Sequence, residues 1–366
     1  MKVIAQTAAL QEALGVAGGI VISRSPKPVL ACVKLIAAEN VLTVLATDLE
    51  VGARYQVTAV QVAEEGEALI PAERLNGIVR ESADEESLTI ETDNQACQVR
   101  GAAGRFKIYG YDAAEYPAVA EFTEEPDFQV EASALSEMIG KTLFATAKAH
   151  SHYAISGVLW EASGKKLQLV ATDGHRLAMA KGSTVKSTAR DVTAIVPAKL
   201  MGLIQRLAGE TDEAIDVKIE ENQILVRTSR AVLISSLVQG NFPKYSDVVP
   251  KETARKAGIN ARLFEHRLRQ AALLTDEESR GVRLSFRGNQ VTLSSRVPEA
   301  GEAELTCEAA YDGEDIDIAF NPAFLIEALR VVDTEKISFE MNASNKPAMI
   351  KAGNDFLYVL MPVDLA

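Results

Sequence analysis

The residues best suited to chemistry are a carboxylate and an imidazole two positions apart, Asp173 and His175. Such a pair can act as a general base, as a hydrolase or transferase would need. No nucleophile or metal-ligating cluster accompanies it, and the same turn occurs earlier around Asp48 without a histidine. We therefore expect Asp173 to cap backbone amides in a turn, and a hydrolase that uses Asp173 and His175 stays an alternative.

Other motifs for phosphate or metal chemistry do not appear in the sequence. The glycine-rich stretch 101–105 resembles a phosphate loop, but it lacks the Gly-Lys-Ser/Thr ending and reads as a hairpin turn. No Walker motif, zinc spacing or acidic metal triad is present. We expect a protein that is not an enzyme and that needs no cofactor or metal.

Composition favours a soluble, cytoplasmic protein. The chain has 366 residues, of which 47% are hydrophobic and 24% charged, without a long apolar run or a convincing signal peptide. Its three cysteines lie far apart, which indicates reduced and mostly buried thiols. The net charge of −13 argues against nucleic acid as a partner only if the charge is evenly spread.

Three phrases recur at one spacing, which indicates a threefold internal repeat. Thr172-Asp173 follows Thr47-Asp48 by 172 − 47 = 125 positions. A Pro-Ala pair begins at residues 71, 197 and 322, and Tyr116-Pro117 corresponds to Phe242-Pro243, with a spacing of 125 or 126 throughout. A repeat of this length predicts three similar domains. We place them at 1–125, 126–251 and 252–366.

Each domain divides again into two halves with the order strand, helix, strand, strand, strand. Alternating apolar residues indicate the strands, and apolar residues three or four apart indicate the helices. In the first domain we expect helices at 7–16 and 72–80, and strands at 2–4, 32–36, 41–47, 52–57, 68–70, 87–91, 96–100 and 104–109. Six such modules predict an α+β shell with sheets on one side and helices on the other. Its open edge strands would pair head to tail in a closed ring.

Several phrases carry a resemblance to a known family. They are Ala171-Thr172-Asp173-Gly174-His175-Arg176-Leu177, Phe242-Pro243-Lys244-Tyr245, Arg280-Gly281-Val282-Arg283-Leu284 and Tyr358-Val359-Leu360-Met361-Pro362. With these the chain resembles the bacterial DNA polymerase III beta subunits, the sliding clamps, over its whole length. The resemblance implies a head-to-tail homodimeric ring around duplex DNA, with helices lining the hole. It also implies a peptide pocket that serves the replicative polymerase, the clamp loader and other clamp-binding proteins, and it implies no membrane partner.

The same resemblance assigns residues to three surfaces. The peptide pocket would comprise His152, Ile155, Thr172, Gly174, His175, Arg176, Leu177, Pro243, Asp247, Val248, Asn321, Phe324, Ala348, Leu360, Met361, Pro362 and Val363. The DNA-facing set would comprise Arg24, Arg74, Arg80, Lys141, Lys148, Lys199, Arg206, Arg262, Arg267 and Arg269. The dimer seam would comprise Arg100, Arg105, Phe106, Lys107, Ile108, Leu273, Leu274, Glu299, Glu302 and Glu304.

Two features depart from the family pattern or leave the interpretation open. His152 and Asp247 stand where the family often carries arginine, and the chain ends in Val363-Asp364-Leu365-Ala366 rather than Met-Arg-Leu. These differences concern the rim of the pocket rather than its apolar floor. A repeat scaffold that does not bind DNA stays an alternative, because any single lysine or arginine can equally be a solvated surface charge.

Overall fold

The computed structural model describes the chain except for residues 23–24, 94–95, 103, 149–152, 187, 189, 210–212, 276–280, 299 and 365–366, and the side chain of residue 153. The chain forms two compact units, which we treat separately. Unit 1 contains Met1–Ser136 and Lys199–Leu237, and unit 2 contains Glu137–Ala198 and Val238–Ala366.

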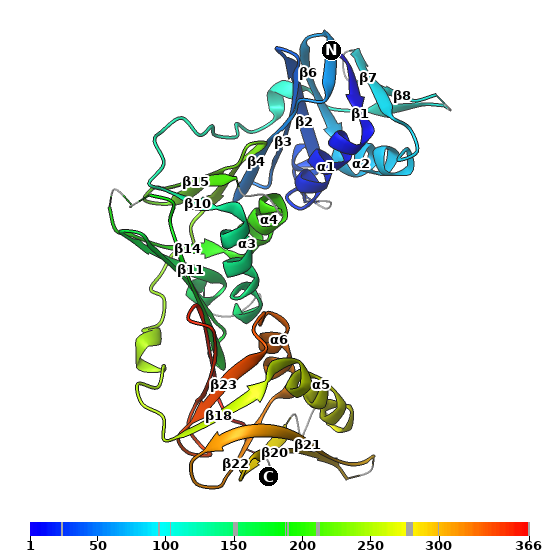
Figure 1. Cartoon of the computed structure of the whole chain (residues 1–366). Helices are drawn as coiled ribbons and strands as arrows, with labels where there is room; N and C mark the ends of the chain where they lie inside the picture. Colours follow the sequence, from blue (N-terminus) through cyan, green and yellow to red (C-terminus); the bar gives the residue numbers. More distant parts are fainter. Residues whose placement is uncertain are drawn as a thin grey trace. The chain divides into compact units, whose positions relative to one another are not determined.

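The predicted order of strand, helix and three strands is confirmed in all six half-domains. The helices are α1 (Thr7–Gly18), α2 (Ala72–Glu81), α3 (Ala132–Gly140), α4 (Ala198–Ala208), α5 (Ala261–Ala271) and α6 (Pro322–Arg330). Short 3-10 turns are η1 (Pro28–Ala31), η2 (Ala113–Glu115), η3 (Leu143–Ala145), η4 (Tyr153–Ile155), η5 (Tyr245–Asp247) and η6 (Ala272–Leu274). Figure 1 shows α1 beside α2 in unit 1, and α5 beside α6 in unit 2.

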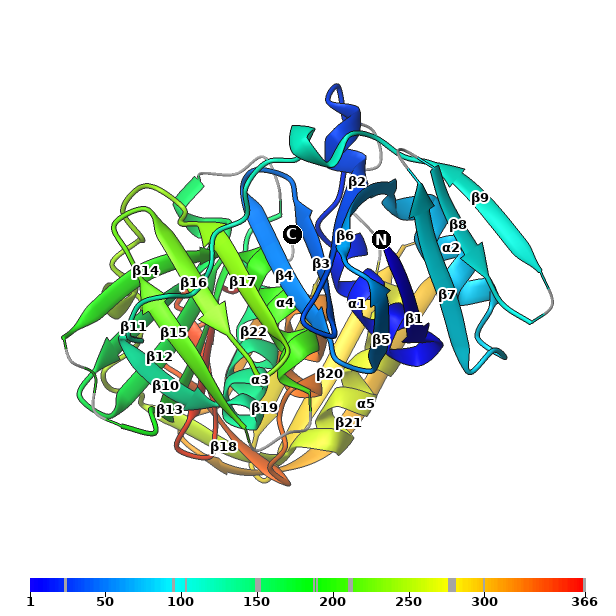
Figure 2. The same cartoon turned by 90° about the horizontal axis from the view of Figure 1, so that it is seen from above.

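Unit 1 holds two antiparallel sheets. The first has the order β5-β1-β7-β8-β9, and Figure 2 shows β9 at its outer edge. Its strands are β5 (Val60–Glu64), β1 (Lys2–Gln6), β7 (Ser87–Asp93), β8 (Ala96–Arg100) and β9 (Arg105–Tyr109). The second has the order β10-β15-β16-β17-β4-β3-β2-β6, with β10 (Phe128–Glu131), β15 (Ala214–Ile219), β16 (Gln223–Arg227), β17 (Ala231–Ser236), β4 (Val51–Val57), β3 (Val41–Thr47), β2 (Cys32–Ala38) and β6 (Gly66–Pro71).

Unit 2 is built on one sheet of twelve strands. Its first part runs β14-β11-β12-β13-β25-β24-β23, with β14 (Val192–Pro197), β11 (Gly157–Ser163), β12 (Lys166–Thr172), β13 (Arg176–Ser183), β25 (Phe356–Leu360), β24 (Ala348–Ala352) and β23 (Lys336–Met341). It continues through β18-β21-β20-β19-β22, with β18 (Arg255–Asn260), β21 (Gly301–Asp312), β20 (Gln290–Val297), β19 (Val282–Arg287) and β22 (Ile316–Phe320).

Local sequence explains where the helices begin and which face they bury. The side chains of Asn260 and Asn321 each accept a hydrogen bond from a backbone N–H in the first turn of the helix that follows. Pro322 is the first residue of α6, where its missing N–H has no cost. In α1, Leu10 and Leu14 lie one turn apart and are fully buried.

Among the described strands of the first repeat, the one absent from our prediction is β5, a five-residue strand that pairs antiparallel with β1. Its sequence, Val-Gln-Val-Ala-Glu, is mostly solvent-accessible and carries a weak apolar pattern. The predicted state of the thiols is confirmed, because Cys32, Cys97 and Cys307 are all free and buried. Across the described residues, no helix is both long enough and apolar enough to span a membrane.

Candidate functional site

The Asp173 turn is a hydrogen-bonded cap at the start of β13. One carboxylate oxygen of Asp173 accepts from the backbone N–H of His175 at 3.0 Å and of Arg176 at 3.1 Å. The Thr172 hydroxyl donates to the Arg176 carbonyl at 2.6 Å and accepts from the N–H of Gly174 at 3.1 Å. The predicted role of Asp173 as a turn former is confirmed.

The first repeat builds the same turn with the same atoms. Asp48 accepts from the N–H of Glu50 at 2.9 Å and of Val51 at 2.6 Å, while the Thr47 hydroxyl donates to the Val51 carbonyl at 3.0 Å. Because the turn is repeated without a histidine, the presence of Asp173 is explained by its role in the repeated fold. Among the described residues, no group of three or more His, Cys, Asp or Glu side chains could hold a metal ion.

Arg176 ties this turn to the third repeat. Its guanidinium forms an ion pair with Asp173 at 3.0 Å, pairs with Glu327 and donates to the carbonyl of Phe144 at 2.8 Å. It also lies 4.3 Å from the ring centroid of Phe324, within cation–π range. The side chain is buried, so Arg176 holds helix α6 and the turn together.

On the other face of the same strands lies an apolar cluster, which we call the Leu177 cluster. Leu177 on β13 pairs directly with Val359 on β25, so their side chains share one face of the sheet. Segment 238–250 packs across that face through four apolar residues. The cluster consists of Leu159, Val170, Leu177, Met179, Ile195 and Val359, with Ala154, Val238, Phe242, Tyr245, Val249 and Leu357 partly buried against them.

The hydroxyl of Tyr245 anchors segment 238–250 to the sheet. It donates to a carboxylate oxygen of Glu161 at 2.6 Å and accepts from the side-chain amide of Gln168 at 2.7 Å. Glu161 and Gln168 face each other across β11 and β12. Burial, and then the hydrogen bond to Glu161, raise the pKa of Tyr245 to about 12. The hydroxyl therefore remains a donor at neutral pH.

Two apolar side chains beside the Leu177 cluster are exposed to solvent. Val248 follows the turn η5 and is 46% exposed, and Met361 follows β25 and is 43% exposed. The N–H of Met361 donates to the carbonyl of His175 at 2.9 Å, which extends the pairing of β13 with β25 by one residue. By strand alternation Met361 lies on the face of Val359. The site thus offers a buried apolar floor with exposed apolar edges.

The register changes one member of the predicted floor. Leu360 pairs with Arg176, and both alternate away from Leu177. Leu360 is buried on the opposite face, so its assignment to the apolar floor is corrected to its neighbour Val359. The sequence reasoning also missed Phe242 and Tyr245, although both belong to a phrase that carried the family resemblance.

The remaining predicted pocket residues have varied surroundings. The Asn321 side chain caps the N-terminus of α6, and Ala348 is buried on β24. His152 lies outside the described residues. The exposed ones are Pro243, Asp247 and His175. The half-buried ones are Ile155, Pro362 and Val363.

Among the predicted DNA-facing residues, Lys141 is a correction. Its side chain is buried and is surrounded by carboxylates, with Asp355 at 2.6 Å, Asp333 at 3.7 Å and Glu137 also paired. Burial opposes the charge, but the hydrogen bonds with Asp355 and Glu137 raise the pKa of Lys141 overall. A lysine enclosed in this way cannot present its charge to a phosphate.

Most of the other predicted DNA-facing residues are on exposed helix surface. Lys199 is held by Asp48 at 2.6 Å and Arg206 by the carbonyl of Gly15 at 2.8 Å, so both also tie α4 into unit 1. Arg267 is half-buried, and Arg24 lies outside the described residues. The exposed members are Arg74, Arg80, Lys148, Lys199, Arg206, Arg262 and Arg269.

The predicted seam residues occupy strand edges and a helix end. Phe106 on β9 is 46% exposed, and Leu273 in η6 is 81% exposed. Ile108 on β9 is buried, and Arg100 on β8 forms an ion pair with Glu91 at 3.6 Å within its own sheet. The other described members of the seam set, Arg105, Lys107, Glu302 and Glu304, are exposed, Leu274 is half-buried, and Glu299 lies outside the described residues.

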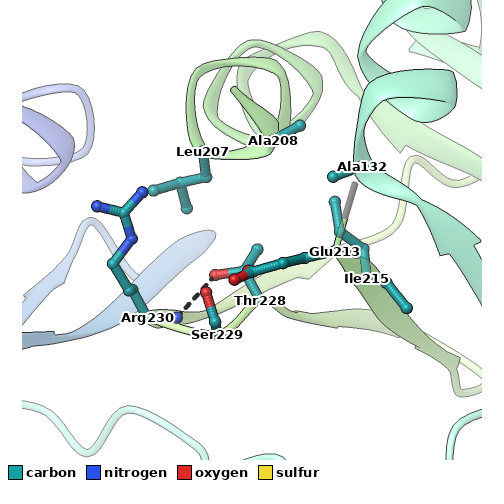
Figure 3. A pocket seen from close by; sticks show the side chains of 9 residues that line it. Ala132, Leu207, Ala208, Glu213, Ile215, Thr228, Ser229 and Arg230 are labelled. Carbon is teal, nitrogen blue, oxygen red and sulfur yellow. Dashed lines mark hydrogen bonds between the residues drawn. The ribbon is translucent and has the colours of Figure 1, made fainter. Parts of the chain in front are cut away.

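A separate cavity of about 280 Å³ opens in unit 1, at the end of α4 and the start of β15 (Figure 3). Thr228, Ser229 and Glu213 present polar groups to it, while Leu207 and Ile215 give it an apolar side. None of the predicted site residues lines this cavity.

Comparison with known proteins covers the whole chain. Three family models match in succession: the DNA polymerase III beta subunit N-terminal domain at residues 1–120, the central domain at 129–244 and the C-terminal domain at 246–364. A beta sliding clamp of Pseudomonas aeruginosa is 31% identical over 362 residues, covering 98% of this chain and 99% of the relative. A beta sliding clamp of Escherichia coli K12 is 29% identical over 358 residues, covering 97% and 96%.

Solved structures agree with this result. A sliding clamp from Pseudomonas aeruginosa bound to griselimycin superposes with a TM-score of 0.93 at 30% identity, covering 100% of both chains. The DNA polymerase III beta subunit of Thermotoga maritima superposes with a TM-score of 0.92 at 27% identity, again covering 100% of both chains.

Proposed function

We propose that this chain, which belongs to the DNA polymerase III beta subunit family of beta sliding clamps, forms a head-to-tail homodimeric ring around duplex DNA. The ring tethers the replicative polymerase and other clamp-binding proteins by short peptides, is opened and closed by a clamp loader, and performs no chemistry itself. Because a replication factor works where the DNA is, we place it in the cytoplasm. The three repeats would be its domains, at 1–125, 126–251 and 252–366.

The observation that carries the ring is how the repeats already join. The last strand of one half-domain pairs with the last strand of another, as β17 pairs with β4 and β25 pairs with β13. In each pair a second half meets the first half of the neighbouring repeat. The strands that remain for the same type of pairing are β9, from the second half of repeat one, and β21, from the first half of repeat three. Pairing β9 with β21 of another copy closes a ring, since a heterologous contact of two copies can close.

The exposed residues on these strands fit such a seam. Phe106 faces Val99 across β8 and β9, just as Leu233 faces Val226 across β16 and β17. Leu233 is fully buried under the neighbouring repeat, whereas Phe106 is exposed and would be covered by the second copy. Between Gly301 and Glu308, strand β21 pairs with β20 alone, and β18 joins its other edge only from Ala309 onward. One edge of the stretch from Gly301 to Glu308 is therefore open among the described strands.

Charge also favours this pairing. The exposed side chains of β9 include Arg105 and Lys107, and those of the open stretch of β21 include Glu302 and Glu304. Opposite charges across a strand pair would set its register and exclude like pairs. The exposed Leu273, in η6 just after α5, would supply an apolar contact at the same seam.

Contact with DNA would come from the helices. Arg74 on α2, Arg206 on α4 and Arg262 on α5 are exposed basic residues on three different helices. Sparse contacts of this kind attract phosphates but read no bases, which suits a ring that slides. The net charge of −13 is compatible with this surface, because the acidic residues can occupy other faces.

Peptide binding would use the Leu177 cluster with Val248 and Met361. A buried apolar floor with exposed apolar edges accepts leucine or phenylalanine anchors. Griselimycin binding by the Pseudomonas aeruginosa clamp supplies a probe for this site. Backbone groups at the edge, among them the exposed turn at Gly174 and His175, would fix the orientation of a peptide.

The ring is tested by topology. Labelled protein is placed by a clamp loader on a nicked circular plasmid, and its release is followed before and after the plasmid is cut once. We expect long retention on the circle and rapid release from the linear form, because only a closed ring is held without tight contacts. Equal release from both forms would contradict the ring, whereas no retention on either form would favour the scaffold without DNA.

The peptide site is tested by truncating its exposed edges. Val248→Ala combined with Met361→Ala removes apolar surface that already faces solvent, so folding should be little affected. We expect griselimycin affinity to fall about tenfold or more, measured by calorimetry. Val185→Ala is the matched control, since Val185 is 44% exposed elsewhere in unit 2. Unchanged affinity in the double variant would remove this surface from the site.

A further inference from the structure

The segment that borders the peptide site has a counterpart in the first repeat, and the two are anchored differently. In the first repeat the Tyr116 hydroxyl accepts from the N–H of Thr47 at 2.9 Å and donates to the carbonyl of Cys32 at 3.2 Å. A Cβ added to Gly52 would lie only 3.1 Å from Cγ1 of Val119. The first-repeat segment is therefore pressed onto the sheet.

Gly52 is the counterpart of Leu177. It pairs with Thr47 across β3 and β4, as Leu177 pairs with Thr172 across β12 and β13. Val119 thus takes the space that the Leu177 side chain occupies in the second repeat. The two junctions share a fold, but the first has no room for a foreign side chain over this position.

In the second repeat the anchor has moved. Phe242 takes the place of Tyr116 and has no hydroxyl to bond the turn. Tyr245, three residues further on, supplies the hydroxyl instead, and it bonds Glu161 on β11 and Gln168 on β12. In the strand order β11-β12-β13-β25, this anchor stands on the side away from Val359.

Val248, the exposed edge of the peptide site, is hydrogen-bonded to the backbone of Tyr245. The N–H of Val248 donates to the carbonyl of Tyr245 at 3.1 Å, and the N–H of Asp247 donates to the carbonyl of Lys244 at 3.1 Å. These bonds make η5 one rigid turn that starts at Tyr245. Any shift of the Tyr245 backbone is therefore passed to Val248.

We propose that Tyr245, held by Glu161 and Gln168, is a positioning residue that fixes turn η5 and with it the Val248 edge of the peptide site. The inference rests on the proposed peptide-binding function and adds a residue that need not touch the peptide. Without the hydroxyl, η5 would sample other positions, and a ligand would have to order it on binding. Such ordering weakens affinity mainly by faster dissociation.

Tyr245→Phe tests the proposal by removing one oxygen while keeping the ring in the Leu177 cluster. We expect griselimycin, and a labelled short peptide with leucine and phenylalanine anchors, to bind about tenfold more weakly and to dissociate correspondingly faster. The matched control is Tyr55→Phe. Burial and then Glu12 raise the pKa of Tyr55 to about 12 as well, but Tyr55 lies in unit 1. We expect this control to bind both ligands like the unsubstituted chain.

Conservative rescue separates positioning from a loss of stability. Glu161→Gln keeps an oxygen that can accept from the Tyr245 hydroxyl, so affinity should stay within about twofold of the original. Glu161→Leu removes the acceptor and should weaken binding as much as Tyr245→Phe does. Equal affinity in Tyr245→Phe and Tyr55→Phe would overturn the positioning role. Failure of the unsubstituted chain to bind either ligand would instead overturn the proposed peptide site.

Discussion

At the scale of single residues, the Thr-Asp turn shows that a chemically suggestive side chain can be architectural. Asp173 and Asp48 cap equivalent amides in two repeats, and only one of the turns carries a histidine. The two turns differ in the residue that follows the aspartate, although its backbone conformation is similar. It is a glycine with φ +91° at position 174 and a leucine with φ +81° at position 49. The exposed Leu49 adopts a conformation that costs a side chain about 1 kcal/mol or more.

Substitutions of Lys141 and Arg262 should have opposite effects on stability and on duplex binding. Lys141→Met should lower the free energy of unfolding by about 1–2 kcal/mol, because the carboxylates left behind are partly exposed rather than fully buried. It should leave binding to a short linear duplex at low salt unchanged. Arg262→Glu should weaken that binding and hardly affect stability, because Arg262 is exposed.

Urea unfolding and fluorescence anisotropy with the labelled duplex give the two readouts. A Lys141 variant with normal stability but weak duplex binding would restore the sequence-based assignment of this lysine.

We expect Glu340 to contribute to the loss of folding stability at acidic pH. The side chain is buried, which opposes its charge, but hydrogen bonds from Thr253 at 2.8 Å, Lys351 at 3.1 Å and Ser338 at 3.1 Å lower its pKa overall. Its stabilising effect is therefore present above the ordinary glutamate pKa and is lost as the pH falls through the lower folded value.

Glu340→Gln should reduce stability at pH 7 and flatten the decline in unfolding free energy between about pH 5 and pH 3. Urea titrations across this range measure the slope. Exposed Glu335→Gln is the control, and an identical slope in both variants would contradict the assignment.

At the scale of elements, strand edges decide what can join. Phe106→Asp places a charge on the open edge of β9, and a buried unpaired charge would prevent the seam from forming. Sedimentation should then give the chain mass of 39.4 kDa instead of twice that value. Val185→Asp introduces the same charge at an exposed valine outside the seam, and we expect it to remain dimeric. A dimeric Phe106 variant would direct attention to another edge.

At the scale of the whole molecule, the repeats are joined by continuous sheets. The pairs β17·β4 and β13·β25 each bridge two repeats, so the two compact units do not coincide with the three repeats. This explains why repeat spacing alone did not predict how the chain divides by contact.

The proposed ring also predicts two different responses to salt. Equilibrium binding to a short linear duplex should weaken steeply as salt rises from about 50 to 200 mM, because phosphate contacts release counterions. Retention on a closed circle should change much less over the same range, because topology rather than contact holds the ring. Anisotropy and plasmid release measure the two quantities. A parallel loss in both would indicate that contacts alone hold the protein on DNA.

The sequence by itself determined the threefold repeat, the order of elements in each half-domain and the capping role of Asp173. These features depend on local spacing and turn chemistry, which neighbouring residues specify. The tertiary structure decided that Val359 rather than Leu360 shares a face with Leu177, since strand register selects the face of a side chain. It likewise enclosed Lys141 among carboxylates, two of which, Asp333 and Asp355, come from a distant part of the chain. It also brought Tyr245 to Glu161 and Gln168, a contact across some eighty positions that no local pattern encodes.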